Sequence, residues 1–330
     1  MMSMDNVLIW NIRSVNTQKA FQRLINLHRK YNFYLIGLIE SWQDINKLEV
    51  YRRKLGIESA FVNVNGMIWA FIDEDIDVEV LIDMDQELIP KLFHRVVSKG
   101  LIGTLVYAKC DVIERIELWD SLYHLASDMM VPWIVGGDFN VILFEEENYV
   151  GLLVYISEVE DFSHCKDICA LYDLGFKGSL YAWWNGRSDD SCIFKRLDRY
   201  LANQQFQDLF PTLEVEHLIK FGYDHAPLVL SCNANTVQVK NSFKILNFWV
   251  RSESFLEIVK ENWKIDIVGN PFITFQQKLI NVKNALAMWC KVTFGNIFKQ
   301  ITALEDIFKV HEVEFELNPT AQNMAKLHKV

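Results

Sequence analysis

Residues 131–140, with the sequence VPWIVGGDFN, decide the fold of this chain. The apolar first half predicts a buried strand, and Asp138 and Asn140 stand at its end. Side chains alternate along a strand, so these two residues point to one side while Phe139 turns toward the core. The two glycines before them allow a sharp turn of the backbone and leave space for a ligand. An acid and an amide placed together suit the activation of water or the binding of a metal-bound phosphate.

Ionisable or amide residues also stand at the ends of three further predicted strands. They are Asn11 after the run at 7–10, Glu40 after the run at 34–39, and Asp224-His225 before the run at 226–230. In a layered α/β protein, ligands gather where strands end at one edge of the sheets. Taken alone, each residue has an ordinary alternative role as a helix cap, a solvated acid or a turn. Four such strand ends together favour a functional site.

The rest of the chain alternates short β-rich runs with amphipathic helices, which is typical of a layered α/β fold. Asn16 or Thr17 is expected to cap the first helix. The expected hairpins pair 67–72 with 78–82 through an acidic turn, and 93–97 with 101–108 through Lys99-Gly100. The expected later helices span 112–129, 158–172 and 274–310, the last with a bend or end at Gly295-Asn296.

These motifs resemble the exonuclease–endonuclease–phosphatase superfamily. The residues that carry the resemblance, in order, are Asn11, Glu40, Tyr107, Asp138, Asn140, Asp198, Asp224 and His225. More narrowly, the chain is similar to the apurinic/apyrimidinic-type endonuclease region of plant non-LTR retrotransposons. That narrower match rests on WNIR at 10–13, LIES at 38–41, NGMIW at 65–69, YAWWNGR at 181–187 and RLDR at 196–199.

The resemblance implies a four-layered α/β sandwich, in which two packed mixed β-sheets are flanked by helices. This domain is expected to span residues 1–235. Residues 236–330 are expected to form a mostly helical C-terminal extension, which in plant elements precedes a reverse transcriptase that this sequence does not contain. The long amphipathic helix at 274–310 is expected to dock onto such a domain, to pack on the nuclease or to self-associate.

The implied reaction is phosphodiester hydrolysis with Mg²⁺, for which Mn²⁺ substitutes. Mg²⁺ takes oxygen ligands, keeps several waters and is bound through one or two carboxylates. By resemblance, Glu40 is the main ligand of the ion, Asn11 positions a metal-bound water or the phosphate, and Asp224 is an auxiliary ligand.

The resemblance also gives each catalytic residue a role. Asp138 orients or deprotonates the attacking water, and Asn140 holds the phosphate or that water. His225 stabilises charge in the transition state, and Asp198 fixes the tautomer of His225. Tyr107 donates to the phosphate. Two alternatives stay open, because Tyr107 also fits a rim tyrosine with a wet hydroxyl and Asp198 a surface ion pair with the flanking arginines.

Residues 181–187 and the residue before Asp224 are expected to face the substrate. The candidate substrate-binding residues are Ala182, Trp183, Asn185, Arg187 and Tyr223. The tryptophan either stacks on a base or belongs to the core. Relatives carry a small hydroxyl residue in place of Tyr223 and a threonine in place of Ala182, and these departures indicate a slower enzyme. Ser14 replaces a usual glycine in a turn expected to tolerate it.

The charge balance is unusual for a protein that binds DNA. The chain has a net charge of −10, and its first 235 residues carry 21 Lys and Arg against 34 Asp and Glu. An acidic body is compatible with DNA as partner if the acids hold a divalent metal, although weak, salt-sensitive binding is then expected. The one dense basic run, residues 52–54, fits a solvated helix face, an import signal or a phosphate contact.

The sequence excludes some classes and leaves three functions open. No apolar run is long enough to span a membrane, and the six cysteines form no CxxC pair, which predicts reduced thiols and an intracellular protein. A nuclear location follows from the DNA substrate. A DNA-nicking endonuclease is the leading hypothesis. A phosphatase of the same superfamily and a catalytically impaired or dead retrotransposon remnant with a binding role are the alternatives.

Overall fold

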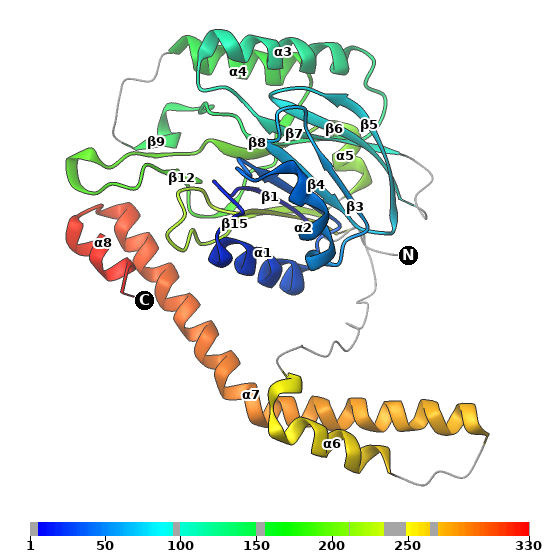
Figure 1. The fold of residues 1–330 in the computed structure, drawn as a ribbon. Coiled ribbons are helices and arrows are strands. Elements are labelled where there is room, and N and C mark those ends of the chain that lie inside the picture. Colours follow the sequence, from blue (N-terminus) through cyan, green and yellow to red (C-terminus); the bar gives the residue numbers. More distant parts are fainter. Residues whose placement is uncertain are drawn as a thin grey trace. The chain divides into compact units, whose positions relative to one another are not determined.

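A computed structural model of the chain describes residues 6–94, 100–149, 156–210, 212–233, 249–264 and 270–329 (Figure 1). Compactness divides the chain into two units. The first unit contains residues 1–236 together with 311–329, and the second contains residues 237–310. The C-terminal segment therefore belongs to the same unit as the N-terminal two thirds of the chain.

Two large sheets and one small sheet build the first unit. The first sheet has the order β11 (Lys177–Gly178), β15 (Thr212–His217), β16 (Leu228–Asn233), β1 (Asn6–Asn11), β2 (Leu35–Ile39), β4 (Ile68–Ile72) and β3 (Ser59–Val62). The second has the order β10 (Tyr172–Asp173), β14 (Asp198–Ala202), β8 (Trp133–Asp138), β7 (Leu101–Tyr107), β6 (Glu87–His94) and β5 (Ile76–Asp83). The small sheet consists of β12 (Trp183–Trp184), β13 (Phe194–Lys195) and β9 (Asn148–Tyr149). Both large sheets are mixed, because β1 runs parallel to β2 and β7 parallel to β8 among antiparallel pairs.

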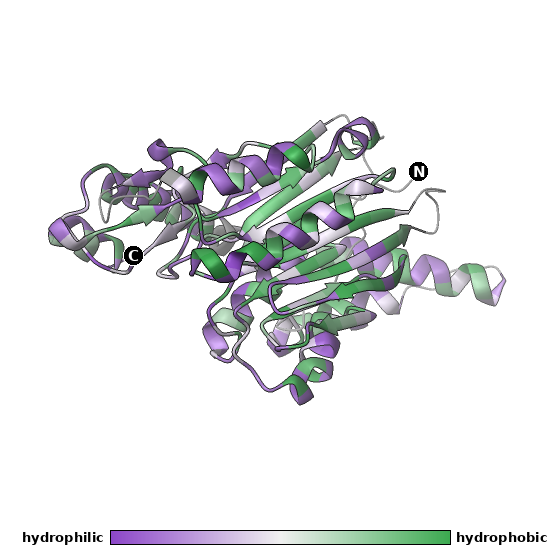
Figure 2. Cartoon of the chain, turned by 90° about the horizontal axis from the view of Figure 1, so that it is seen from above, coloured by the Kyte–Doolittle hydropathy of each residue, from purple (hydrophilic) through white to green (hydrophobic). Residues whose placement is uncertain are grey.

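The two large sheets pack face to face, with helices on both outer sides. Strands β1 and β2 share one apolar core with β6, β7 and β8 between the sheets. Helices α1 (Gln18–Tyr31) and α2 (Leu48–Leu55) cover the outer face of the first sheet, and α3 (Val112–Ser127) and α4 (Ile156–Ile168) cover that of the second. Apolar residues dominate the strands, whereas the helices carry both kinds (Figure 2). The predicted four-layered sandwich with a helical C-terminal extension is confirmed.

The expected hairpin of residues 67–72 and 78–82 is wrong. Strand β4 is buried along its whole length and pairs with β2 and β3 in the first sheet. Strand β5 pairs with β6 in the second sheet. No edge of β4 is left for β5, so the acidic turn carries the chain from one sheet to the other. The second hairpin pairs β6 with β7, but its first strand is earlier than the expected 93–97, because residues 87–92 pair with 101–106. Residues 95–99, which include most of the expected strand and Lys99 of the turn, lie outside the described residues.

The two glycines before Asp138 serve packing rather than a turn. Both belong to β8, and a Cβ atom on Gly136 would lie 2.6 Å from Cδ1 of Ile9 across the inter-sheet core. Gly137 has a φ of +151°, and a Cβ atom there would lie 2.0 Å from the carbonyl oxygen of Val106. Only glycine permits this close approach of β7, β8 and β1. The residues that follow are thereby fixed at the sheet edge.

Helix starts agree with the capping residues in the sequence. The Thr17 side chain accepts from the backbone N–H of Ala20 at the start of α1, and Asp111 caps α3 in the same way. Helix α5 (Gln204–Leu209) begins at Asn203, whose side chain accepts from the N–H of Phe206. Short 3₁₀ turns lie at Ile45–Lys47, Glu145–Glu147, Asp189–Ser191 and Trp249–Arg251.

The second unit consists of α6 (Glu253–Trp263) and the first part of α7 (Pro271–Leu317), which continues into the first unit. Trp289 packs edge-on against Trp249 and Phe255, and its indole N–H donates to the hydroxyl of Ser254 at 3.0 Å. Helix α7 continues through Gly295-Asn296, so it does not end there as one of the two expected possibilities required. A last helix, α8 (Ala321–Leu327), follows it. Among the described residues, no helix is long and apolar enough to cross a membrane.

Candidate active site

The strand ends that carry the predicted polar residues meet around one cavity of about 440 Å³. Asn11, Asp198 and Asp224 are not in its lining, but each contacts a residue that is. Its lining residues are Arg13, Glu40, Tyr107, Cys110, Asp138, Asn140, Val141, Ile142, Glu158, Trp183, Lys195, Leu197 and His225. Strands β2, β7 and β8 deliver the acids and the tyrosine, because their carboxyl ends lie at the same edge of the two sheets. Strands β12 and β13 and the segment before β16 also line the cavity, with Trp183, Lys195 and His225.

Asn11 joins the two acids at the centre of the site. Its side-chain amide donates to Oε1 of Glu40 and to Oδ2 of Asp138, both at 2.9 Å. Asn11 is fully buried at the end of β1, and its side-chain oxygen accepts from the N–H of Arg13 at 3.3 Å. One amide from the first sheet therefore fixes the distance between two carboxylates that belong to different sheets.

Arg13 lies between Glu40 and Asp224. Its Nε atom is 2.9 Å from Oδ2 of Asp224 and 3.6 Å from Oε2 of Glu40, while its side chain is 54% exposed. Burial raises the pKa of Glu40, but hydrogen bonds from Asn11 and Trp42 and the charge of Arg13 outweigh it and lower that pKa overall. The two carboxylates thus converge on a position that already holds a positive group.

His225 faces two carboxylates on the other side of the cavity. Its Nδ1 lies 2.8 Å from Oδ2 of Asp198, and its Nε2 lies 3.9 Å from Oδ2 of Asp138. Burial lowers the pKa of His225, but Asp198 and then Asp138 outweigh it and raise the pKa to about 9. Burial and the charge of Asp198 raise the pKa of Asp138 to about 6. At neutral pH the imidazole is therefore protonated and Asp138 is mostly ionised.

Two sets of side chains could hold a cation. Asp138, Asp198 and His225 offer ligand atoms within 4.8 Å of one another. However, both ring nitrogens of a protonated His225 carry protons, and Asp198 already accepts one of them. Glu40 and Asp224 offer only oxygen atoms, which Mg²⁺ prefers, around a partly exposed guanidinium that can move out. The Glu40–Asp224 side of the cavity therefore fits a hard divalent cation better.

Tyr107 and Asn140 complete the polar rim. Tyr107 lies opposite Asp138 in the β7–β8 ladder, and burial and the charge of Glu40 raise its pKa, so its hydroxyl remains a donor. Asn140 has a φ of +51°, and its N–H donates to Oδ1 of Asp138 at 3.0 Å. The Asn140 side chain donates to the carbonyl of Ala108 at 2.7 Å, which holds it at the cavity.

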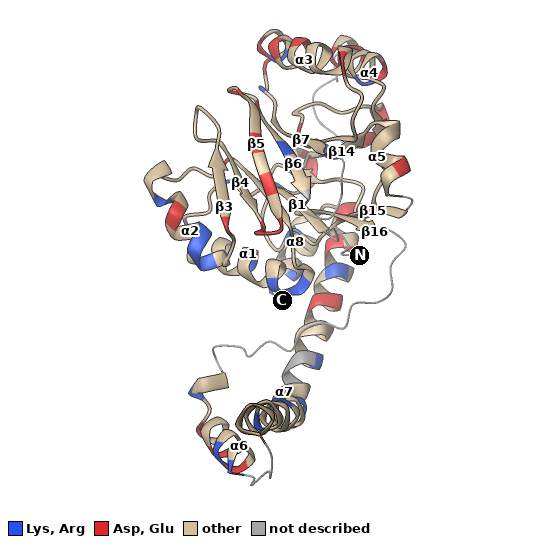
Figure 3. Ribbon diagram, turned by 90° about the vertical axis from the view of Figure 1, so that its right-hand side faces the viewer, with Lys and Arg blue, Asp and Glu red and all other residues tan. Residues whose placement is uncertain are grey.

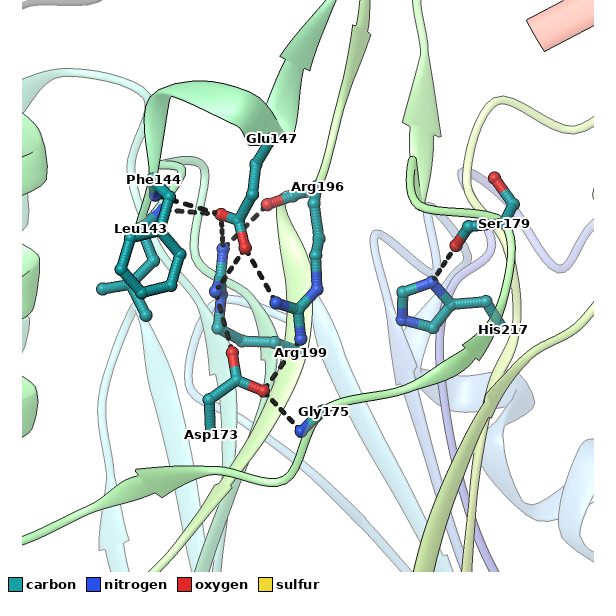
Figure 4. A network of polar contacts seen from close by, with 9 residues as sticks. All are labelled: Leu143, Phe144, Glu147, Asp173, Gly175, Ser179, Arg196, Arg199 and His217. Atoms are coloured by element: carbon teal, nitrogen blue, oxygen red, sulfur yellow. Dashed lines mark hydrogen bonds and ion pairs between the residues drawn. The ribbon is translucent and has the colours of Figure 1, made fainter. Parts of the chain in front are cut away.

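The two arginines around Asp198 bind other acids (Figure 4). Arg196 contacts Glu147 at 2.7 Å and Asp173 at 2.8 Å, and Arg199 contacts the same two carboxylates at 2.8 and 3.0 Å. We call these four residues the arginine network. Asp198 is 1% exposed and pairs with His225 instead, which speaks against a surface ion pair.

The substrate-binding candidates are divided between the cavity and other places. Trp183 lines the cavity, with its ring 6.4 Å from that of His225. Ala182 is buried beneath it, and Arg187 is exposed. Asn185 donates to the carbonyl of Ser191 and accepts from the N–H groups of Arg187 and Ile193, so it shapes its own loop.

Tyr223 does not line the cavity. Its ring packs edge-on against Trp10 at 5.1 Å, and the guanidinium of Arg23 lies 5.1 Å from the ring centre. The backbone at Ser14 is strained, which the sequence did not predict. Ser14 adopts a φ of +123°, in a region that favours glycine.

Sequence reasoning missed four contributors to the site. Arg13 was visible in the WNIR motif, but its bridging position depends on the fold. Trp42 is 59% exposed and donates from its indole N–H to Oε2 of Glu40 at 3.1 Å. Lys195 and Glu158 line the cavity from β13 and α4 without any local signal. The basic run at 52–54 ends α2, where Arg52 binds Glu49 and the carbonyls of Ile57 and Glu58 (Figure 3).

Solved structures with similar folds include two nucleases and a phosphatase. They are the endonuclease domain of TRAS1, a telomere-specific non-LTR retrotransposon; an AP endonuclease from Archaeoglobus fulgidus; and the 3′ phosphatase NExo from Neisseria bound to a product DNA hairpin. Their TM-scores are 0.53, 0.57 and 0.55, each at 15% sequence identity. Each match covers 70% of this chain and 100% of the solved chain.

No protein-family model and no curated protein matches the sequence. The likeness in structure is thus one of fold, and it agrees with the order of the motifs along the chain. The chain has the fold of the exonuclease–endonuclease–phosphatase superfamily, as its sequence motifs predicted.

Proposed function

We propose that this chain is a metal-dependent phosphodiesterase that nicks DNA and derives from a non-LTR retrotransposon. The observation that carries the proposal is the pair of hydrogen bonds from Asn11 to Glu40 and Asp138, opposite the Asp198–His225 pair, around one cavity. Two carboxylates for a cation, a third acid for the attacking water and a protonated histidine for the phosphate suit phosphodiester hydrolysis.

In the proposed reaction, the oxygen of a water attacks phosphorus while one P–O ester bond breaks, and the leaving sugar oxygen takes a proton from a solvent water. Asp138, ionised above about pH 6, accepts the proton of that water. His225, protonated below about pH 9, donates to the phosphoryl oxygen on which charge develops. Asp198 holds the imidazole through Nδ1, so Nε2 faces the substrate. Tyr107 and Asn140 orient the phosphate from the rim.

Glu40 and Asp224 would hold Mg²⁺ or Mn²⁺, with Asn11 fixing the Glu40 carboxylate. The cation neutralises phosphoryl charge when bound. Arg13, which lies between the two acids, would move toward the phosphate and remain a counter-charge there. Its 54% exposed side chain has the freedom to do so.

Two features favour an active enzyme over a remnant. Tyr223 packs against Trp10 and Arg23, and Ala182 is fully buried in the core, so neither departure from the family pattern contacts the described polar groups of the site through its side chain. A phosphatase acting on polyphosphorylated small molecules is less favoured, because Arg13 and Lys195 are the only lysine or arginine side chains among the described lining residues. A DNA backbone presents one charge per phosphate and needs fewer cations at the reacting centre.

The substrate, the cellular location and the partners of the chain are also proposed. A DNA substrate and a nuclear location follow from the proposed activity. Docking on a reverse transcriptase, or self-association, through residues 274–310 is supported by the exposed apolar residues Ile301, Leu304 and Ile307 on α7. Such a row of apolar side chains at helical spacing suits a helical partner.

The test is nicking of supercoiled plasmid by the purified chain with Mg²⁺, with an EDTA control and a His225→Ala variant. We expect metal-dependent conversion to open circles that is lost in the variant. A Tyr223→Ser variant is included, and we expect it to nick at the native rate. Absence of nicking by both the native chain and Tyr223→Ser would overturn the proposal, and release of phosphate from small esters alone would favour the phosphatase.

A further inference from the structure

The last nineteen described residues of the chain pack on the first unit, next to the wall of the cavity. Residues 311–329 comprise the end of α7 and the helix α8, and they belong to the first unit by compactness. They fall outside the 1–235 boundary expected for the nuclease domain. Their contacts therefore decide whether they are a linker or part of the catalytic unit.

An ionic contact joins this segment to the loop before Asp224. The Lys220 ammonium lies 2.9 Å from Oε1 of Glu316 and 3.9 Å from Oε1 of Glu312. The backbone N–H of Lys220 also donates to Glu312 at 2.9 Å. Lys220 and Glu312 are 4% and 7% exposed, so the charges are withdrawn from water and depend on each other.

An aromatic contact joins the segment to the loop that carries Trp183. Phe315 is 1% exposed, and its ring packs edge-on against Trp184 at 5.1 Å and Phe194 at 5.7 Å. Glu316 also accepts from the hydroxyl of Ser179. Edge-to-face aromatic pairs in a buried cluster fix the mutual position of the elements that contribute them.

Backbone hydrogen bonds join the segment to the same loop at its far end. The N–H of Asp189 donates to the carbonyl of Pro319 at 2.6 Å, and Oδ1 of Asp189 accepts from the N–H of Ala321 at 3.1 Å. Asp189 thereby caps the start of α8, although its own φ is +52°. Residues 311–329 therefore contact the stretch 179–193 at three places, Ser179, Trp184 and Asp189.

The elements that contact residues 311–329 are hydrogen-bonded to the segment that carries His225. The N–H of Trp184 donates to the carbonyl of Asp224 at 2.9 Å, and the N–H of Ala226 donates to the carbonyl of Ala182 at 2.8 Å. Trp183 and His225 face each other in this short bridge. Phe315 thus packs on the side chain of Trp184, and the backbone N–H of Trp184 binds Asp224, the residue before His225.

We propose that residues 311–329 are a brace, an integral part of the catalytic unit that positions Trp183 and His225. This rests on the proposed nuclease function for its catalytic consequence, but its structural consequence stands separately. A shift of about 1 Å at a catalytic group can cost on the order of 100-fold in rate. The residues of the brace and those that contact it act as positioning residues, since none of Lys220, Phe315 and Glu316 lines the described cavity.

The test compares full-length Phe315→Ala and Glu316→Gln variants with Glu314→Gln. Glu314 lies on the same helical turn, but its carboxylate binds only His311 and Lys326 among the described contacts. The readouts are kcat and KM for plasmid nicking, and amide hydrogen exchange of peptides covering 181–187 and 221–228. We expect at least about a tenfold drop in kcat, little change in KM and faster exchange in both peptides for the first two variants.

Native kcat and native exchange in Phe315→Ala and Glu316→Gln would overturn the proposal, as would an equal loss in Glu314→Gln. A Phe315→Leu variant retains apolar volume and is expected to recover most of kcat. If Phe315→Ala does not fold, Glu316→Gln and Phe315→Leu decide the question. If the native chain does not nick, faster exchange in the variants still supports the brace while the nuclease proposal fails.

Discussion

Strand β14 and the residues before it belong to two buried charge clusters that behave in opposite ways. Arg196 and Arg199 point into the arginine network, where two guanidiniums each contact the same two carboxylates. Asp198, between them, points to the cavity, where it shares His225 with Asp138. Two positive charges face two negative charges in the network, whereas two acids face one imidazole in the second cluster.

Charge balance decides the ionisation of each cluster. In the network, the arginines outweigh burial and lower the pKa values of Glu147 and Asp173, so both acids stay ionised. At the cavity, burial and Asp198 raise the pKa of Asp138 to about 6, and the surrounding acids raise that of His225 to about 9. The charges of the network balance each other within the protein, whereas Asp138 and His225 at the cavity have pKa values that suit proton exchange with a substrate.

Backbone conformation separates the clusters in the same way. The loops of the cavity contain Arg13, Ser14, Glu40, Trp42 and Asn140, all with positive φ. In the described part of the chain, none of the four network residues has such a φ. Sparsely populated backbone conformations cost free energy and persist where the surroundings enforce them. The cavity loops thus carry both backbone strain and an imbalance of charge, whereas the arginine network carries neither.

Breaking the network is expected to have the largest effect. Glu147→Gln removes one carboxylate and leaves two buried guanidiniums facing a single acid, which is expected to lower the free energy of unfolding by about 3–5 kcal/mol. The measurement is urea or thermal unfolding at pH 7. Asp138→Asn is the matched change at the cavity, and we expect it to abolish nicking with a smaller loss of stability than Glu147→Gln. Equal stability losses in both variants would erase the distinction.

Replacing the cavity histidine is expected to lower the nicking rate. His225→Ala removes the protonated donor to the phosphoryl oxygen, and we expect nicking to fall about 10²–10³-fold. His217→Asn is the control for loss of a buried imidazole. His217 binds the carbonyl of Ser179, and burial lowers its pKa to about 3, so it is neutral and lies outside the cavity lining. A comparable loss of rate in the control would contradict the assignment.

The fold itself was readable because its signals are local and repeated. Apolar runs ending in Asn11, Glu40 and Asp138 predicted both the buried strands and the polar edge at which they end. Thr17 predicted the start of α1 through its capping geometry. The order of these short motifs was sufficient for the superfamily fold, although sequence identity to the similar structures is only 15%.

Contacts between residues that lie far apart in the sequence could not be predicted from it. The acidic turn after β4 has the composition of a hairpin, and only the pairing of β4 on both edges sends β5 to the other sheet. Arg13 and Lys195 reach the cavity from far apart in the sequence, and Lys220 finds Glu312 across 92 residues. Tyr223 follows the same logic, since its place beside Trp10 depends on how two strands meet.

The two clusters are expected to lose their contributions to folding stability at opposite ends of the pH range. The folded pKa of His225, about 9, lies above its ordinary value of 6.5, so its contribution is complete below pH 6.5 and is lost as pH rises through 9. That loss is on the order of 3 kcal/mol. The pKa values of Glu147 and Asp173 are lowered, so the stability they contribute is lost as pH falls below about 4.

Unfolding measured from pH 3 to 10 tests both limbs. In His225→Ala, the alkaline loss should be absent while the acid loss remains, and in Glu147→Gln the acid loss should be reduced. Nicking rates should rise through about pH 6, as Asp138 ionises, and fall through about pH 9. An alkaline limb that persists in His225→Ala would assign it to another group.

The smallest expected effect concerns the strain of the cavity loops. Ser14 has a φ of +123°, where its Cβ atom is unfavourable and glycine is not, so Ser14→Gly is expected to raise the free energy of unfolding by about 0.5–1 kcal/mol. The gain is limited because glycine also gains freedom in the unfolded chain. Ser163→Gly, within α4, is the opposite control and is expected to destabilise by about 1 kcal/mol. If Ser14→Gly stabilises the chain while lowering the nicking rate, the strained turn holds Arg13 in place between Glu40 and Asp224. If it stabilises without any change in rate, the strain at this turn is only a cost, and the charge imbalance alone distinguishes the cavity from the arginine network.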